Sequence, residues 1–314
     1  SFFGDVEKFL GIACKYDRKL GTLTLDQKEY IDEILHNFKM EKCKGVNSPM
    51  IHKPTQNDCP ERRFKELQIQ ESTGKLSKEQ IDKAQTDLLD EVQQMKKVPY
   101  RSLIGALSHL ARHTRFDIQF TTFYHARYQT DPGWTHWINL KRALRYLKYT
   151  RDYEMEAKRD VPFLRTTCDS DLGGGDNSKS TTGYCQELCG IIIHASSRLQ
   201  VMTAKSSTEA EIIALCDCVE QTVWIRNILQ DLGMTITPVI ECDNQPAIRT
   251  VLNNQLCKGN KHIARRYHFV KGYVDAGIIQ IKYVPSAENR SDLLTKPLNG
   301  PQLAGLLQGI YKQP

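Results

Sequence analysis

The sequence predicts an α/β protein in which a mixed five-stranded sheet with flanking helices follows a mostly helical region that begins with a short β hairpin. Between residues 163 and 297, strand and helix patterns follow one another in the order βββαβα(α)βα, which is typical of one mixed-sheet domain. Between residues 99 and 150, apolar residues recur at helical spacing. The 314 residues are 40% hydrophobic and 25% charged, a composition that excludes global disorder, a collagen-like chain and a coiled-coil rod.

Residues 1–54 form the first predicted unit. Strand patterns cover residues 5–14 and 21–25, with a polar turn between them, so a short β hairpin is expected. Asp26 fits the N-cap of a helix, and Glu29 three residues later completes a capping box. Apolar residues at helical spacing then predict the helix itself.

Residues 55–98 are rich in Lys, Glu, Asp and Gln, which indicates a charged surface insertion or linker. Ser77 and Gln80 have the spacing of a second capping box. A charged helix is therefore expected from this point to Met95.

Residues 99–160 are predicted to be a basic helical region, all-helical from residue 99 to residue 150, with helices at residues 100–113, 117–128 and 134–149. Eleven Lys and Arg oppose five Asp and Glu between residues 99 and 159, so this stretch alone accounts for the net charge of +6. Such a stripe favours nucleic acid or another polyanion as a partner, although the solvated face of an ordinary helix fits the composition equally well. The residues expected to contact nucleic acid share the third helix: Lys141, Arg142, Arg145 and Lys148.

Residues 161–298 are expected to hold the five-stranded sheet, and residues 299–314 to form a C-terminal tail. Strands are predicted at residues 163–168, 182–188, 191–195, 239–242 and 278–284. Helices are predicted at residues 206–232, 245–252, 262–276 and, as a short last helix, 291–296.

Cysteine usage and the absence of targeting segments bear on the compartment. The ten cysteines are too sparse for a disulfide scaffold, and neither a CxxC pair nor a His pair suggests zinc, so we interpret them as reduced thiols of an intracellular protein. No apolar run approaches the ~20 residues that span a bilayer, and the first residues lack the features of a signal peptide. We therefore expect a cytoplasmic protein, and its start at Ser1 indicates a piece of a longer chain.

Four carboxylates stand at the ends of predicted elements. Asp169 and Asp243 end strands, Glu209 lies in the first turns of the long helix, and Asp292 starts the last helix. Acids placed in this way can converge on one edge of a sheet, where bound divalent cations would offset their repulsion. Oxygen ligands without His or Cys select Mg²⁺ or Mn²⁺, and two such ions about 4 Å apart can promote phosphodiester cleavage. Any one of these acids, taken alone among 37, would be interpreted as a solvated surface group.

Motifs along nearly the whole chain resemble the Pol polyproteins of copia-type LTR retrotransposons. Residues 163–297 resemble the RNase H domain of that family through the stretches Lys179–Tyr184, Ser206–Glu211, Cys242–Gln245, Lys261–Ile263, Arg266–Phe269 and Asp292–Pro297. Upstream stretches resemble the end of the reverse transcriptase palm, the thumb and the connection: Phe9–Ile12, Gln27–Met40, Ser48–Met50, Pro99–Gly105 and Leu140–Lys148.

The resemblance implies an RNase H-like fold and hydrolysis of the RNA strand of RNA–DNA hybrids with two Mg²⁺ ions, or Mn²⁺ as a substitute. It implies products with a 3′-hydroxyl and a 5′-phosphate. Asp169, Glu209, Asp243 and Asp292 match the metal-binding carboxylates of the family, and Asp171 is at most an outer neighbour.

The partners that the resemblance implies are the hybrid, the template–primer, and the palm and fingers that would precede residue 1, with no membrane. The implied location is the cytoplasm, within virus-like particles, with nuclear access left open. No Tyr-x-Asp-Asp motif occurs, so we expect no DNA synthesis by this chain alone.

Some features leave alternatives open. Leu172 stands where the family has an aromatic residue, and the insertion at residues 59–97 is longer than is common, which suggests drift and reduced activity. The main alternative is a catalytically silent nucleic-acid-binding or assembly module of a truncated polyprotein. A DDE-type nuclease related to integrases is disfavoured, because the Glu of the acid set comes second here and not last.

Overall fold

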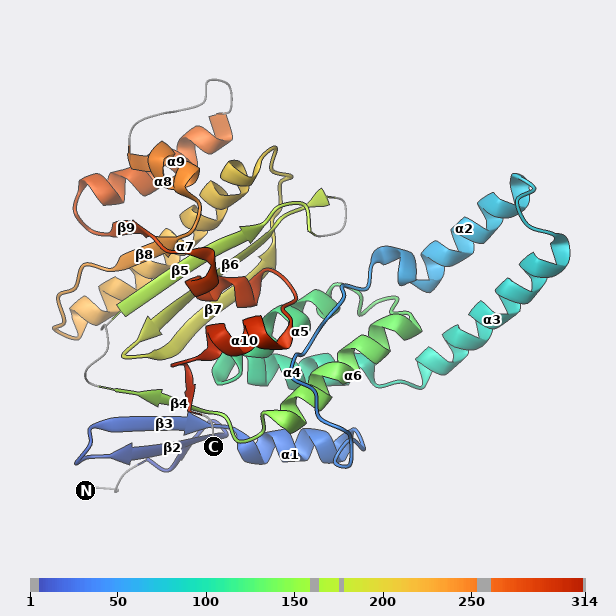
Figure 1. The fold of residues 1–314 in the computed structure, drawn as a ribbon, viewed down its shortest axis with the longest axis horizontal. Helices are drawn as coiled ribbons and strands as arrows, with labels where there is room; N and C mark the ends of the chain where they lie inside the picture. Colours follow the sequence, from blue (N-terminus) through green and yellow to red (C-terminus); the bar gives the residue numbers. More distant parts are fainter. Residues whose placement is uncertain (1–5, 159–163, 175–177, 253–260, 313–314) are drawn as a thin grey trace.

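The computed structural model describes residues 6–158, 164–174, 178–252 and 261–312. Within these residues the chain forms two five-stranded sheets, with helices between and around them (Figure 1). The boundary expected between residues 160 and 161 lies outside the described residues.

The first sheet has the order β1-β2-β3-β4-β10, and every neighbouring pair in it is antiparallel. Its strands are β1 (Lys8–Phe9), β2 (Ile12–Asp17), β3 (Thr22–Asp26), β4 (Glu154–Ala157) and β10 (Tyr311–Lys312). The predicted N-terminal hairpin is thus confirmed. Helix α1 (Lys28–Asn37) follows it, but the predicted capping box does not form: Asp26 accepts the backbone N–H of Lys28, and Glu29 pairs with Lys8 at 2.6 Å.

The charged segment forms two helices, α2 (Pro60–Ser72) and α3 (Lys78–Lys96), where one was predicted. They project together from the body of the molecule as a helical hairpin (Figure 1). An ion pair of 2.5 Å between Arg63 and Glu91 joins them. The capping box of Ser77 and Gln80 is confirmed, with N···O distances of 3.0 and 3.3 Å.

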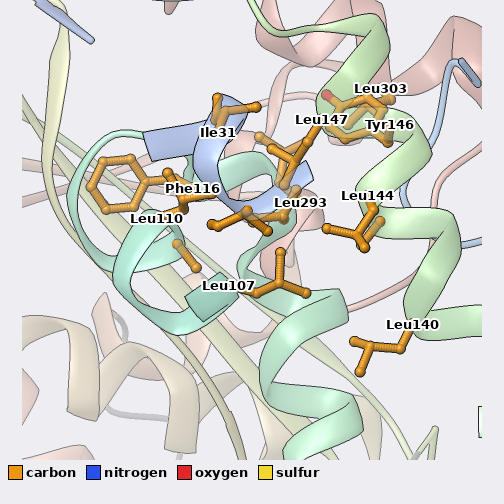
Figure 2. Close-up of a cluster of buried hydrophobic side chains, with 14 of the residues drawn as sticks. Ile31, Leu107, Leu110, Phe116, Leu140, Leu144, Tyr146, Leu147, Leu293 and Leu303 are labelled. Carbon is orange, nitrogen blue, oxygen red and sulfur yellow. The ribbon is translucent and has the colours of Figure 1, made fainter. Parts of the chain in front are cut away.

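Three helices form the basic region, as predicted: α4 (Tyr100–His113), α5 (Gln119–Ala126) and α6 (Trp134–Tyr149). Figure 2 shows how the apolar faces of α4 and α6 meet: Leu107 and Leu110 of α4 lie close to Leu140 and Leu144 of α6. Ile31 of α1 joins the same cluster. Burial of such side chains contributes about 1.5–3 kcal/mol each and fixes how the helices pack.

The second sheet has the order β7-β6-β5-β8-β9, in which β7, β6 and β5 are antiparallel neighbours and β5, β8 and β9 are parallel. This confirms the predicted mixed five-stranded sheet with flanking helices. Its strands are β5 (Leu164–Asp171), β6 (Thr181–Leu188), β7 (Ile191–Leu199), β8 (Val239–Cys242) and β9 (Gln280–Tyr283). The helices of this part are α7 (Ser207–Asp231), α8 (Gln245–Leu252), α9 (Lys261–Asp275) and α10 (Gly300–Leu307), together with the 3₁₀ turn η5 (Arg290–Leu294).

Alternation along β5 assigns the two faces of the second sheet. Cys168 packs against Leu215 and Cys218 of α7, so α7 covers one face. The side chains of Thr167 and Asp169, on either side of Cys168, contact residues 291 and 295. The turn η5 and helix α5 therefore cover the opposite face.

The two halves of the chain share one core. Leu293 of η5 and Leu303 of α10 lie in the same buried cluster as the residues of α1, α4 and α6 (Figure 2). Residues 299–314, expected as a tail, supply α10 and β10, and β10 pairs with β4. The buried Tyr311 hydroxyl donates to the carbonyl of Thr114 at 2.9 Å, so the last strand is anchored in the helical region.

Candidate functional site

Three aspartates meet at one end of the second sheet. Each of Asp169, Asp243 and Asp292 offers a carboxylate oxygen, and these oxygens all lie within 4.8 Å of one another. Asp169 lies near the end of β5, Asp243 directly follows β8, and Asp292 lies in η5. The structure therefore brings together three of the four predicted acids.

The register of two parallel strands places the first pair. Cys168 of β5 is the Cα partner of Cys242 of β8, and the next residue on each strand is an aspartate. Because parallel neighbours run in the same direction about 4.8 Å apart, Asp169 and Asp243 emerge side by side. Ser286, in the connection after β9, donates to the Asp243 carboxylate at 2.6 Å.

The third aspartate is positioned by the attachment of η5 to β5. The Asn289 side chain donates to the carbonyl of Cys168 at 2.9 Å. The hydroxyls of Ser291 and Thr167 share a hydrogen bond of 2.7 Å, and the Thr295 hydroxyl donates to Asp169. These three contacts flank Asp292 on both sides and hold its carboxylate against the strand.

Close approach of η5 to the sheet requires a glycine on β6. Gly183 is the Cα partner of Asp169, directly beside it on the neighbouring strand. A Cβ atom at Gly183 would lie 2.6 Å from the methyl group of Thr295 and 2.8 Å from Cβ of Leu294. Since real Cβ contacts are longer, a larger residue would push η5 and Asp292 away from β5.

Glu209, the fourth predicted acid, is not brought into the cluster. It occupies the N3 position of α7, where its carboxylate accepts the backbone N–H of Lys205 at 2.9 Å, and its own N–H donates to the Ser206 hydroxyl at 3.2 Å. This is a capping arrangement at a helix N-terminus. The structure thus places Glu209 at the helix cap and outside the group of three aspartates.

Glu211, two residues later, faces the site in its place. Its carboxylate lies within 4.8 Å of ligand atoms of Cys242 and Asp243, and it accepts the backbone N–H of Ser170 at 3.2 Å. The side chain is buried. The signal that could have found it is the spacing S-x-x-E itself, which assigns Glu209 to the cap and leaves Glu211 for the sheet.

The crowding of acids changes their protonation. Burial, followed by the charge of Asp292, raises the pKa of Asp169 to about 7. Burial and then Asp169 raise the pKa of Glu211 well above its usual value. Lys296 lowers the pKa of Asp169 against these effects, and its ammonium lies 2.9 Å from a carboxylate oxygen of Asp292.

Hard divalent cations fit this donor set. The three converging aspartates provide only oxygen, the ligand that Mg²⁺ and Mn²⁺ prefer. The raised pKa of Asp169 indicates that a positive charge is favoured at this point. Glu211 would join from the α7 side through its contact with Asp243. Asp171 faces elsewhere, in an ion pair of 2.5 Å with Lys53.

The four cations predicted to contact nucleic acid lie on α6, in two environments. Arg142 donates to the Ser48 hydroxyl at 3.1 Å and Arg145 to the carbonyl of Lys44 at 2.8 Å, so both help to hold the segment before α2. Lys141 lies over the Trp134 and Trp137 rings. Lys148 is exposed.

Comparison with known proteins identifies relatives along nearly the whole chain. The chain is 32% identical over 314 residues to the retrovirus-related Pol polyprotein from transposon TNT 1-94 of Nicotiana tabacum, covering 98% of this chain and 22% of that protein. It is 32% identical over 299 residues to that from transposon RE2 of Arabidopsis thaliana, covering 94% of this chain and 18% of that protein. The chain thus spans about a fifth of the length of these relatives.

Among solved structures, the RNase H1 named LC11, isolated from compost, aligns with 43% of this chain and 94% of its own, at 16% identity and a TM-score of 0.35. No protein-family model matches the chain. The two polyproteins match both the helical region and the carboxylate-bearing sheet, so the resemblance noted in the sequence motifs is confirmed. The chain belongs to the family of retrovirus-related Pol polyproteins of copia-type transposons.

Proposed function

We propose that the chain is a ribonuclease H that hydrolyses the RNA strand of RNA–DNA hybrids. The observation that carries the proposal is the convergence of Asp169, Asp243 and Asp292 at one end of a mixed sheet, with Glu211 beside Asp243. Four acids at one point are unfavourable in a merely structural role, because burial and mutual repulsion work against their charged forms. Their placement is favourable where cations and a phosphodiester are bound.

Each residue has a proposed task. Asp169 and Asp243, fixed by the register of β5 and β8, would hold the cations, and Asp292 would complete the ligand set from η5. When bound, two Mg²⁺ ions supply an activated water and stabilise the leaving oxygen of the phosphodiester. Thr295 and Ser286 keep the carboxylates of Asp169 and Asp243 in fixed orientations.

The basic helix α6 would bind the sugar–phosphate backbone of the hybrid. A hybrid is recognised by its shape and its 2′-hydroxyl groups, and the charge contacts should make binding sensitive to salt. We propose Lys148 and Lys141 as the direct contacts, because Arg142 and Arg145 already bond within the chain. The proposed location is the cytoplasm.

The test is an assay of the purified chain with a labelled RNA–DNA hybrid in Mg²⁺, Mn²⁺ or EDTA. We expect metal-dependent cleavage that is lost in Asp169→Asn and kept in Asp275→Asn, a matched change of an exposed acid on α9. Equal cleavage by Asp169→Asn and the wild type would exclude the assigned site.

The alternative is a nucleic-acid-binding or assembly module without activity. The cationic excess between residues 99 and 159 favours it, since this excess does not depend on the carboxylates. Hybrid binding without cleavage in any metal would support this alternative.

A further inference from the structure

Lys296 stands among the aspartates of the candidate site. Its ammonium lies 2.9 Å from a carboxylate oxygen of Asp292, and it directly follows Thr295, whose hydroxyl donates to Asp169. Lys296 lines a small cavity together with Phe120 and Thr121 of α5. Two neighbouring side chains, Thr295 and Lys296, therefore contact two different aspartates of the site.

The charges of the site act on this lysine as a group. Partial burial lowers the pKa of Lys296, but Asp169, Asp292 and Asp243 outweigh it and raise the pKa above its usual value. The ammonium thus interacts electrostatically with all three cluster aspartates, although it forms an ion pair with Asp292 alone among them. Reciprocally, Lys296 lowers the pKa of Asp169 against the effects of burial and Asp292.

We propose that the Lys296 ammonium is an internal counter-cation of the aspartate cluster, which a divalent cation must displace from Asp292 in order to bind. This inference rests on the proposed function, because it concerns the metal site assigned there. The lysine stabilises the cluster when no metal is bound and, by the same contact, lowers the affinity for metal.

The side chain is suited to this exchange. Lysine carries a compact point charge on a flexible stem, unlike the planar fork of arginine. The Lys296 side chain is 40% exposed, whereas that of Asp292 is 11% exposed, so the ammonium can swing to solvent while the carboxylate stays in place. The contact is also local, four residues apart along the chain, so breaking it leaves the other anchors of η5 intact.

The test compares Mn²⁺ binding to the full chain by electron paramagnetic resonance in wild type, Lys296→Met, Lys296→Arg and Lys271→Met. Lys271 is a matched control, because it pairs with Asp275 at 2.8 Å over the same four-residue spacing, away from the cluster. We expect Lys296→Met to bind Mn²⁺ about tenfold more tightly, which corresponds to about 1.4 kcal/mol. Lys271→Met should bind as the wild type does, and Lys296→Arg, which keeps the positive charge, should bind no more tightly than the wild type.

Thermal unfolding supplies a second readout. In EDTA, Lys296→Met should unfold at a lower temperature than the wild type, because three aspartates then face one another without a counter-charge. Saturating Mn²⁺ should remove that difference. Should Lys296→Met fail to fold, Lys296→Gln against Lys296→Arg gives the same comparison of neutral and charged side chains.

The outcomes separate this inference from the proposed function. Equal or weaker Mn²⁺ binding by folded Lys296→Met, with the wild type binding normally, overturns the counter-cation alone. Unchanged Mn²⁺ affinity with weakened hybrid binding would instead assign Lys296 to the substrate phosphate. No Mn²⁺ binding by the folded wild type would refute the metal site, and both proposals with it.

Discussion

Arg115 and Asp117 form a two-point ion pair that solvent does not reach: Nε lies 3.0 Å from Oδ1 and Nη2 lies 2.7 Å from Oδ2. Arg115 also donates to the carbonyl of Thr150 at 3.0 Å, and the Tyr146 hydroxyl donates to Asp117 at 2.7 Å. The Tyr311 ring lies 5.8 Å from the guanidinium. The pair therefore joins α6 and the last strand to the turn between α4 and α5.

Removal of one partner of this pair should destabilise the fold. Asp117→Ala leaves a buried guanidinium without its counter-charge, so we expect the free energy of unfolding to fall by about 3–5 kcal/mol. Urea unfolding followed by circular dichroism measures it. The control is Asp32→Ala, which breaks an exposed pair with Arg151 and should lower stability by less than about 1 kcal/mol. Similar losses in both variants would contradict the role assigned to burial.

Glu211 and Glu209 should respond differently to the same substitution. Glu211→Gln removes a carboxylate from the cluster, so we expect hybrid cleavage to fall on the order of a hundredfold, with a loss of Mn²⁺ affinity. Glu209→Gln keeps a side chain that can still accept the Lys205 N–H, so activity should stay near that of the wild type. The reverse ranking of the two variants in a hybrid-cleavage assay would restore Glu209 to the site.

Gly183→Ala should disturb the site without altering any carboxylate. The added methyl group collides with Thr295 and Leu294, so we expect a loss of about 1–3 kcal/mol and weaker Mn²⁺ binding as Asp292 shifts. Gly105→Ala is the control: it lies inside α4, nothing lies near its Cβ position, and alanine there should stabilise by about 0.5–1 kcal/mol. Unfolding curves and Mn²⁺ titration of Gly183→Ala that match the wild type would show that η5 can adapt.

Stability without metal should fall as the pH rises toward 7. Burial and then Asp292 raise the pKa of Asp169 to about 7 from its ordinary value of 3.8, so the folded chain binds this proton more tightly than the unfolded chain does. The resulting stabilisation is complete below the unfolded pKa and is lost as the pH rises through the folded pKa. Unfolding in EDTA between pH 4 and pH 8 should show this decline in the wild type and a flatter profile in Asp169→Asn.

The same proton couples to metal binding. Because a cation competes with it, Mg²⁺ affinity should rise with pH through the pKa of Asp169, and binding at pH 6.5 should release protons. Calorimetry in two buffers of different ionisation enthalpy measures the release. A release that is the same in Asp169→Asn would assign the proton to another group.

The salt dependence of hybrid binding should distinguish Lys148 from Arg145, because Lys148 is exposed and Arg145 is bonded within the chain. Lys148→Ala should weaken hybrid binding and reduce the slope of log affinity against log salt by about 1, with little change in stability. Arg145→Ala should mainly destabilise, because it loses the bond to the Lys44 carbonyl. Fluorescence anisotropy at several salt concentrations measures the affinity for the hybrid. If Lys148→Ala leaves the salt slope unchanged, Lys148 does not contact the hybrid.

Much of this fold could be predicted because its elements carry local signals. The sequence pattern singles out Asp169 and Asp243 because they lie at or just after the ends of β5 and β8, and Asp292 because it lies in a turn that follows β9. Glu211 is not among the predicted acids, because it lies two residues from Glu209 in the same helical turn and only the S-x-x-E spacing from Ser206 separates the two. The distinction depends on which residue caps α7, and that residue is Ser206.

Other features depend on contacts far apart in the sequence. Helix α2 buries Pro60 and little else, so it has almost no apolar pattern, and its pairing with α3 through Arg63 and Glu91 cannot be seen locally. Strand β10 is two residues long, too short for a period-two pattern. Its existence follows from its pairing with β4.

The attachment of β10 to β4 sets an order of events during synthesis. Tyr311 meets Thr114, a residue 197 positions earlier, and β4 has β10 as its outer neighbour in the first sheet. Contacts of such long sequence separation form slowly, and a growing chain cannot make them until its late residues have emerged from the ribosome. The helical region can collapse early around its leucines. The buried contacts around Arg115 and Thr114 stay incomplete until Tyr311 has been synthesised. All five strands of the second sheet are therefore synthesised before β10 can pair with β4 and complete the first sheet.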